Sequence, residues 1–279
     1  MVIHPDVIII GGGLAGLTSA LHLSKQGFNV TLIEKHDFPR HKVCGEYVSN
    51  EVLPYLHWLQ VDVESLCPTH IRELEFSTEG GQMNRVRLPL GGIGISRYAL
   101  DDLLYQRAKG AGCTIVIATV TGVSFSNDTF AVSFQDQVLR SKIVLGAYGK
   151  RSNVDQLLSR DFITKTSPWM AVKAHYSGDF PNDLIALHHF EGGYCGISKV
   201  EDDQINLCYL ADVKTFKRYK NIGDYQKYVL SKNRHLQCFF EKSRLLFDKP
   251  LAISQFSFDQ KSAVENHMLM IGDTAGLIH

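Results

Sequence analysis

Three glycines near the start of the chain stand at a spacing that suits phosphate binding. Gly11, Gly13 and Gly16 follow a short apolar run and form the pattern Gly-x-Gly-x-x-Gly. The first glycine allows a tight turn, the second lets the backbone approach a pyrophosphate, and the third lets a helix pack closely on a strand. Leu14 and Ala15 then begin a helix whose free N–H groups and dipole favour negative charge. The pattern predicts a phosphate-bearing ligand.

An acidic residue completes the same unit. A helix expected over about 14–26 ends at Gly27, a second apolar strand covers 28–33, and Glu34 stands at its tip. A carboxylate there accepts hydrogen bonds from ribose hydroxyls and repels a 2′-phosphate. A glycine pattern alone is also typical of an ordinary turn, but strand, helix, strand and acid in this order predict dinucleotide binding. Both NAD and FAD fit, and we include the adjacent Lys35 in the predicted site.

Composition places the chain among ordinary soluble proteins. The 279 residues are 44% hydrophobic and 21% charged, and 29 basic residues balance 29 acidic ones. This balance gives no reason to expect nucleic-acid binding. The apolar stretch 7–23 contains four glycines and follows a segment without Lys or Arg, so we do not expect a signal peptide or an integral membrane segment. We expect a soluble, cytoplasmic protein.

Cysteine and histidine spacing does not predict a metal site. The six cysteines form no Cys-x-x-Cys pair and have no histidine at ligand spacing, so neither disulfides nor zinc are expected. Most of these thiols are predicted to be small buried hydrophobic groups. His188 and His189 are adjacent and would face opposite sides of a strand, so they do not form a joint ligand set.

Hydrophobic patterning divides the rest of the chain into elements. We predict apolar strands at 114–119, 143–145 and 267–271 that continue the parallel sheet. We expect the strand at 114–119 to be buried. Alternating residues predict hairpins at 71–77 with 83–88 and at 120–126 with 129–134. Helices are expected over about 50–59 and, after an N-cap at Ser96, over about 97–109. From about 168 to 258, long alternating strands with helices over 225–240 indicate an inserted antiparallel domain whose cavity would face the nucleotide.

A second acid selects flavin among the dinucleotides. The strand 267–271 ends in Gly272-Asp273, which places a carboxylate at the mouth of the sheet. There it can accept a hydrogen bond from a sugar-alcohol chain, although Gly-Asp alone is equally typical of a helix cap.

The combination resembles the flavoprotein superfamily of p-hydroxybenzoate hydroxylase and the geranylgeranyl reductases, over nearly the whole chain. The matching motifs are 6–16 with Glu34, Lys42-Val43-Cys44-Gly45, Arg97 with Leu100-Asp101, and Gly272-Asp273. The resemblance implies FAD as cofactor, with its ADP half at the glycine turn, Arg97 near the cofactor and Asp273 on the ribitol. NAD(P)H is a candidate electron donor.

Cys44 is the one catalytic residue that we predict. In the reductase branch a similar loop brings a Cys-Gly pair close to the flavin ring. The basic neighbours Arg40, His41 and Lys42 would make an exposed thiol more reactive. The alternative is a loop cysteine that only fills space.

The chain departs from the family pattern at three places. Hydroxylases of this group carry Ala-Asp-Gly where this chain has Ala147-Tyr148-Gly149, and reductases carry Tyr-x-Trp where it has Tyr194-Cys195-Gly196. We therefore expect a reshaped substrate pocket. The family also continues past Gly-Asp into a helix that faces the flavin, so we expect that this chain, which stops at His279, is truncated.

The predicted fold is α/β. Residues 1–167 are predicted to form a Rossmann-like FAD-binding domain with a parallel sheet. Residues 168–258 are predicted to form an inserted, mainly antiparallel α+β substrate domain, on which the hairpin 71–95 leans. Residues 259–279 return to the first domain. The predicted function is an FAD-dependent oxidoreductase that reduces an apolar small molecule, as geranylgeranyl reductases do. The alternatives are a monooxygenase of the p-hydroxybenzoate hydroxylase type and a non-enzymatic nucleotide-binding remnant. The sequence does not predict an oligomeric state.

Overall fold

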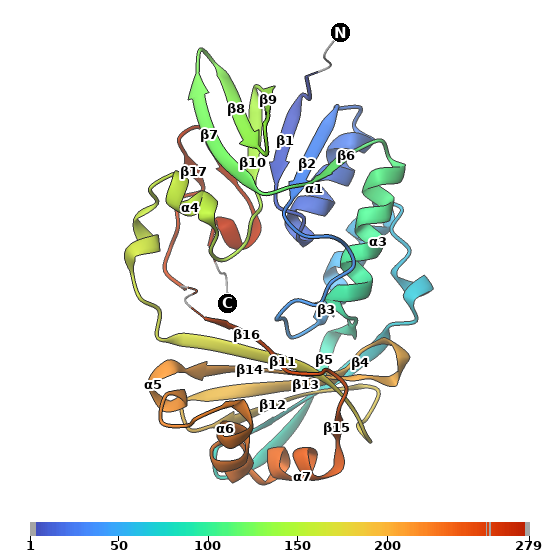
Figure 1. The fold of residues 1–279 in the computed structure, drawn as a ribbon. Helices are drawn as coiled ribbons and strands as arrows, with labels where there is room; N and C mark the ends of the chain where they lie inside the picture. Colours follow the sequence, from blue (N-terminus) through green and yellow to red (C-terminus); the bar gives the residue numbers. More distant parts are fainter. Residues whose placement is uncertain (1–3, 255, 257, 277–279) are drawn as a thin grey trace. The chain divides into compact units, whose positions relative to one another are not determined.

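The computed structural model describes residues 4–254, 256 and 258–276. The chain forms two compact units (Figure 1). Unit 1 comprises residues 1–40, 101–167 and 256–279, and unit 2 comprises 41–100 and 168–255. The expected truncation concerns His279, which lies outside the described residues.

Unit 1 is built on a six-stranded sheet in the order β17-β18-β10-β1-β2-β6. Its strands are β1 (Val7–Ile10), β2 (Val30–Glu34), β6 (Thr114–Ile117), β10 (Ile143–Gly146), β17 (Val264–Glu265) and β18 (Met268–Met270). All neighbours pair in parallel except β17 with β18, which confirms the predicted parallel sheet. Helix α1 (Leu14–Lys25) connects β1 to β2, and Gly27 follows it with a positive φ of 89°.

One expectation for this sheet is wrong. Residues 114–119 were expected to be buried, but β6 is the edge strand, and both Thr114 and Ile117 are exposed. An edge strand has a neighbour on one side only, and its apolar composition does not reveal that position.

A three-stranded antiparallel sheet of β7 (Val120–Ser126), β8 (Thr129–Phe134) and β9 (Gln137–Ser141) completes the strands of unit 1. The hairpin predicted at Asn127-Asp128 is confirmed, and both residues have the positive φ that a tight two-residue turn requires, 49° and 54°. Strand β9 was not predicted. The short helices α4 (Asn153–Leu157), η3 (Asp161–Thr164) and η6 (Gly272–Thr274) also belong to this unit.

Unit 2 contains a nine-stranded sheet in which the main path runs β15-β11-β14-β13-β12-β4-β5-β3, with β16 also paired to β11. The strands are β3 (Tyr47–Ser49), β4 (Thr69–Ser77), β5 (Met83–Gly94), β11 (Trp169–Ser177), β12 (Leu184–Phe190), β13 (Gly193–Lys199), β14 (Ile205–Asp212), β15 (Arg244–Leu245) and β16 (Leu251–Ser254). We expected only the hairpin near 71–95 to approach the second domain. The whole of 41–100 belongs to unit 2, because β4 pairs with β12 and carries β5 and β3 with it.

Helices α5 (Val213–Phe216), α6 (Ile222–Tyr228) and α7 (Arg234–Lys242) cover one face of this sheet (Figure 1). Val172, Ile197 and Tyr209 from the strands are fully buried against Tyr225 and Leu236 from the helices. The remaining helices are η1 (Asn50–Val52), α2 (Leu53–Trp58), η2 (Val63–Leu66), η4 (Glu201–Asp203) and η5 (Leu230–Lys232).

Side chains alternate between the two faces of a strand, so the neighbours of these core residues point the other way. We call this second face, which α5 to α7 do not cover, the open face. Lys173 and His175 of β11, Asn206 of β14 and Tyr194 of β13 lie on it.

Helix α3 (Arg97–Gly110) begins as predicted, because the Ser96 hydroxyl accepts a hydrogen bond from Ala99 N at 3.0 Å.

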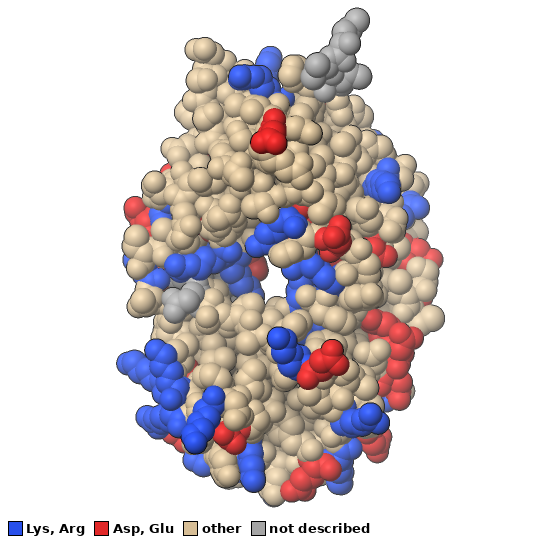
Figure 2. All heavy atoms as spheres, viewed as in Figure 1, with Lys and Arg blue, Asp and Glu red and all other residues tan. Residues whose placement is uncertain are grey.

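All six cysteines are free thiols, but only Cys113 and Cys195 are buried, so the expectation that most of them are buried is wrong. Both acidic and basic side chains are spread over the face drawn in Figure 2. None of the described helices is long and apolar enough to span a bilayer.

Candidate functional site

The turn between β1 and α1 admits only glycine at two positions. Gly11 has φ of 110°, and a Cβ on it would overlap the Ala147 carbonyl oxygen. A Cβ on Gly16 would overlap the Gly11 carbonyl oxygen. Gly13 is the N-cap of α1, and no side chain among the described residues caps the helix there. The N–H groups of the first turn, at Leu14 and Ala15, are therefore open to a ligand.

Glu34 lies beside this turn and is 5% exposed. Its Oε2 accepts a hydrogen bond from Gly12 N at 2.6 Å, and its Oε1 accepts from His36 N at 3.1 Å and from Arg40 Nη2 at 3.4 Å. A carboxylate has about four lone-pair sites, so Glu34 keeps capacity for a ribose hydroxyl. The neighbouring Lys35 is exposed.

The second glycine-acid pair meets the same helix. Gly272 has φ of 58°, and a Cβ on it would come within 2.7 Å of the Ala15 Cβ. The Gly272-Asp273 segment therefore lies against the first turn of α1, where only a glycine fits. Asp273 is exposed, and its carbonyl oxygen accepts a hydrogen bond from Lys261 Nζ at 3.2 Å.

A buried arginine that the sequence did not indicate holds this segment. Arg160 is 3% exposed, and its guanidinium donates to Asp155 Oδ1 at 3.1 Å, to the Thr274 carbonyl at 3.0 Å and to the Ser262 carbonyl at 2.9 Å. Gly149 N donates to the Thr274 hydroxyl at 2.8 Å. The segment 272–274 is thus fixed from two sides within unit 1.

Tyr148 occupies the position where the resembled hydroxylases carry an aspartate. Its hydroxyl donates to Met270 Sδ at 3.4 Å, and burial raises the pKa of Tyr148, with a further contribution from the Asp155 charge. The side chain is therefore a neutral phenol, and it does not replace the missing carboxylate.

In unit 2 the predicted Cys44 loop is attached to the open face. Asn206 Nδ2 donates to the carbonyl oxygens of Cys44 at 3.3 Å and Gly45 at 2.8 Å. The half-buried Cys44 thiol accepts a hydrogen bond from Glu46 N at 3.4 Å. Arg97, the first residue of α3, donates its backbone N–H to Glu46 Oε1 at 2.8 Å. Cys44 and Arg97 are therefore both connected to Glu46.

Glu46 is the centre of a buried charge cluster. Its Oε1 accepts from Lys173 Nζ at 2.7 Å, and its Oε2 lies 2.7 Å from His175 Nε2. All three residues are at most 1% exposed. Glu46 has φ of 55°, a left-handed conformation that is uncommon outside glycine and is retained where the surrounding structure enforces it.

The charges of the cluster determine its protonation. Burial alone would raise the pKa of Glu46, but hydrogen bonding and charge from His175 and Lys173 outweigh it and hold that pKa below its usual range. His41 lies next to the cluster, and burial together with the charges of Lys173 and His175 lowers its pKa to about 4. Glu46 is thus anionic and His41 neutral near pH 7. Sequence patterning missed this cluster, and its one local signal is the alternating pair Lys173 and His175 on an otherwise apolar strand.

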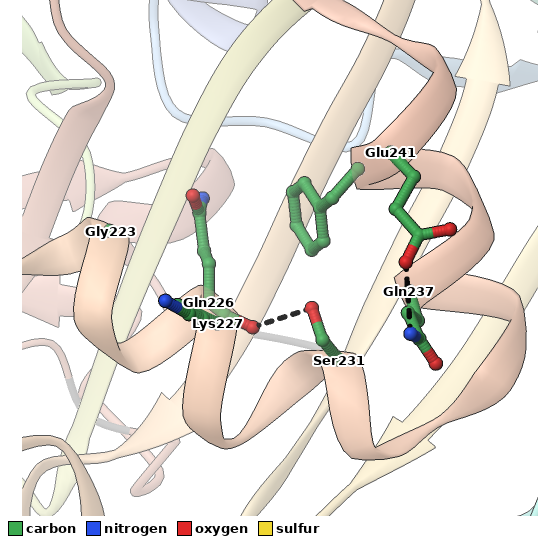
Figure 3. Close-up of a pocket in the computed structure, with 7 residues that line it drawn as sticks. Gly223, Gln226, Lys227, Ser231, Gln237 and Glu241 are labelled. Carbon is green, nitrogen blue, oxygen red and sulfur yellow. Dashed lines mark hydrogen bonds between the residues drawn. The ribbon is translucent and has the colours of Figure 1, made fainter.

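The helix-covered side of unit 2 carries a groove with a volume of about 510 Å³ between α6, η5 and α7 (Figure 3). Two hydrogen bonds join residues that line it: Ser231 Oγ donates to the Gln226 backbone carbonyl at 3.0 Å and Gln237 Nε2 to Glu241 Oε1 at 2.9 Å.

Comparisons with known proteins agree with this geometry. Residues 6–45 match the family described as FAD dependent oxidoreductase. The chain is related to FAD-dependent oxidoreductases. It is 26% identical over 196 residues to a menaquinone reductase of Mycobacterium tuberculosis, covering 67% of this chain and 48% of that protein. It is 29% identical over 168 residues to digeranylgeranylglycerophospholipid reductase 1 of Methanothermobacter thermautotrophicus, covering 55% of this chain and 41% of that protein.

A solved flavoprotein/dehydrogenase from Cytophaga hutchinsonii has the same fold, with a TM-score of 0.85 at 17% identity over 99% of this chain and 72% of that one. The predicted α/β flavoprotein fold and the resemblance to FAD-dependent oxidoreductases are thus confirmed. The chain spans less than half the length of the two reductases it matches.

Proposed function

We propose that the chain binds FAD and substrate as an oxidoreductase that reduces an apolar small molecule. The observation that carries the proposal is the glycine cradle of unit 1. Gly11, Gly16 and Gly272 each stand where a Cβ would collide, and they surround the uncapped N-terminus of α1. A ligand with a pyrophosphate fits such a cradle.

Four of the predicted cofactor residues then have a role that their chemistry allows. The N–H groups of Leu14 and Ala15 would bind the pyrophosphate, and Glu34 the ribose of the ADP half. Asp273, whose backbone is fixed by the neighbouring Thr274, would bind the ribitol. FAD, when bound, supplies the redox chemistry, and the protein supplies binding, orientation and exclusion of water. NAD(P)H as electron donor and a cytoplasmic location remain predictions.

The open face of unit 2 offers an apolar surface for the substrate. Leu187, Tyr194 and Leu210 lie on it, and Tyr194 is exposed. Gly196 stands between Leu187 and Cys208, where a Cβ would make only ordinary contacts at 3.5 and 3.6 Å. The glycine at the Trp position of the reductases thus leaves room on this face, as a reshaped apolar site requires.

Reduction is favoured over hydroxylation for two reasons. The two relatives above are named reductases, and Tyr148 lacks the carboxylate of the resembled hydroxylases. Cys44, which is half-buried on the open-face side, would then lie near the substrate. Hydroxylation of an aromatic-like substrate is the competing activity, and a nucleotide-binding remnant is the non-enzymatic alternative.

The proposal is tested with the purified chain and added FAD. We expect stoichiometric flavin absorbance after desalting, and a chain that cannot be loaded with FAD would support the remnant. With the flavin reduced under anaerobic conditions, reoxidation by an unsaturated apolar compound indicates a reductase. Oxygen uptake coupled to a hydroxylated product would instead establish a monooxygenase.

A further inference from the structure

A buried lysine of unit 1 joins two loops that leave neighbouring strand ends. One loop, 147–150, follows β10, and the other, 271–275, follows β18, which pairs with β10 in parallel. Lys261 is 8% exposed, and its Nζ donates to the carbonyl oxygens of Lys150 at 2.8 Å and of Asp273 at 3.2 Å. Ligands of open α/β sheets bind outside the carboxyl ends of the strands, which is where both loops lie.

The surroundings of Lys261 are uncommon for a lysine. Lysine is rarely buried unless its charge is paired, yet both acceptors of Lys261 are neutral carbonyl groups. Its Nζ also lies 4.3 Å from the centroid of the Phe162 ring. Burial and the Arg160 charge lower the pKa of Lys261, whereas the charges of the two carboxylates of Asp155 and Asp273 oppose that shift. The fold thus keeps a costly buried cation where it holds two backbone segments together.

The other contacts of this junction go to the residue after Asp273. Gly149 N donates to the Thr274 hydroxyl at 2.8 Å, and the Arg160 guanidinium donates to the Thr274 carbonyl at 3.0 Å. Among the described residues, Lys261 provides the one side-chain hydrogen bond to Asp273 itself. The Asp273 side chain is exposed, so its carboxylate is open to a ligand while its backbone is held from below.

We propose that Lys261 is a positioning residue for the flavin half of FAD, because it holds the Asp273 backbone from which the carboxylate binds the ribitol. This inference rests on the proposed function, which assigns Asp273 to the ribitol. The ADP half depends instead on Gly11, Gly16 and Glu34, and Lys261 makes no hydrogen bond to these residues. Lys261 therefore contributes to the selection of FAD over a nucleotide that offers ADP alone.

Paired titrations with FAD and with ADP test this role in the 279-residue chain. We expect Lys261→Met to weaken FAD binding about 10-fold in calorimetry, the effect of losing one charged hydrogen bond, and to leave ADP binding unchanged. Lys261→Arg retains a cationic donor and should recover part of the FAD affinity. Lys165→Met is the matched control, because Lys165 is a lysine of unit 1 whose side chain is 65% exposed. If Lys261→Met does not fold, Lys261→Gln, which keeps a neutral donor, replaces it.

A double-mutant cycle shows whether Lys261 acts through Asp273. Asp273→Ala removes the carboxylate and should itself weaken FAD binding. In that background we expect Lys261→Met to have little further effect on the FAD affinity, because the group that it positions is gone. Equal FAD affinities of Lys261→Met and Lys165→Met would overturn the inference. So would an equal loss of FAD and ADP affinity in Lys261→Met, or fully additive effects in the cycle.

Backbone amide hydrogen exchange provides a readout that needs no nucleotide. In Lys261→Met we expect faster exchange over 147–150 and 271–275 than in Lys165→Met, with unchanged exchange over α1. Exchange that is equal in the two variants, or that is faster throughout unit 1, would contradict a positioning role. If the wild-type chain binds no FAD, the proposed function fails, whereas the exchange comparison still decides whether Lys261 holds the segment that contains Asp273.

Discussion

Neutralising Glu46 should destabilise unit 2 more than any other single charge removal that we consider. Glu46→Gln keeps the shape of the side chain and the left-handed backbone, but it leaves Lys173, which is 0% exposed, without its counter-ion. The new amide also places an N–H group against His175 Nε2 or against Lys173 Nζ, whichever way it is turned. Removing one partner of a buried ion pair costs about 3–5 kcal/mol, and we expect a loss of that size in the free energy of unfolding.

Tryptophan fluorescence during urea unfolding measures this loss directly, because both tryptophans of the chain, Trp58 and Trp169, lie in unit 2. Glu73→Gln is the matched control. Its partner Arg85 lies at 2.7 Å, but the two side chains are 45% and 31% exposed, so we expect a cost below about 1 kcal/mol.

A double-mutant cycle then separates the ion pair from other effects. Lys173→Met in the Glu46→Gln background should cost much less than in the wild type, with a coupling of about 1–3 kcal/mol. Equal effects of Glu46→Gln and Glu73→Gln, or fully additive effects in the cycle, would refute the reasoning. The contribution of Glu46 should also disappear as the pH falls through the lowered pKa of its folded state, because protonation removes the charge.

Further predictions concern unit 1 and the pH dependence of stability. Glu34→Ala should weaken FAD binding by about 1–3 kcal/mol in a fluorescence titration, and Asp37→Ala, at an exposed neighbour, should not; equal affinities would remove Glu34 from the site. Gly16→Ala should abolish FAD retention because its Cβ overlaps the Gly11 carbonyl oxygen, whereas Gly110→Ala meets nothing within 4 Å and should retain FAD. Burial, with the charges of His235 and His189, lowers the pKa of His188 to about 4. Stability from a neutral His188 is thus complete above pH 6.5 and declines towards pH 4, by up to about 3 kcal/mol; a His188→Gln variant with the same pH profile would contradict this.

The nucleotide-binding unit was predictable because its determinants are close in the chain. Gly11 needs its positive φ for the turn itself, Gly16 must lack a Cβ because of the Gly11 carbonyl oxygen in the same turn, and Glu34 follows on the adjacent parallel strand. Local sterics and hydrogen bonding therefore determine both the motif and its geometry. The hairpin of β7 and β8 was predictable for the same reason, because its two alternating strands are joined directly by the Asn127-Asp128 turn.

Alternation along β11 is where sequence reasoning reached its limit. Lys173 and His175 alternate with apolar residues, as on a strand with one face in water, yet both are buried. Their partner Glu46 is 127 and 129 residues away in the chain. A polar residue on a strand is compatible with solvent or with a buried partner of opposite charge, and only knowledge of the neighbouring loop distinguishes the two.

The sequence by itself determined the parallel sheet, the glycine turn with its acid, and the kinship with FAD-dependent oxidoreductases, because these depend on short-range spacing. Only the tertiary structure decided that residues 41–100 join the second unit, that β6 is an edge strand, and that the buried carboxylate of Glu46 joins Arg97, Lys173 and His175. Strand pairing and ion pairing between distant segments depend on which surfaces meet after folding, and no local pattern encodes that choice.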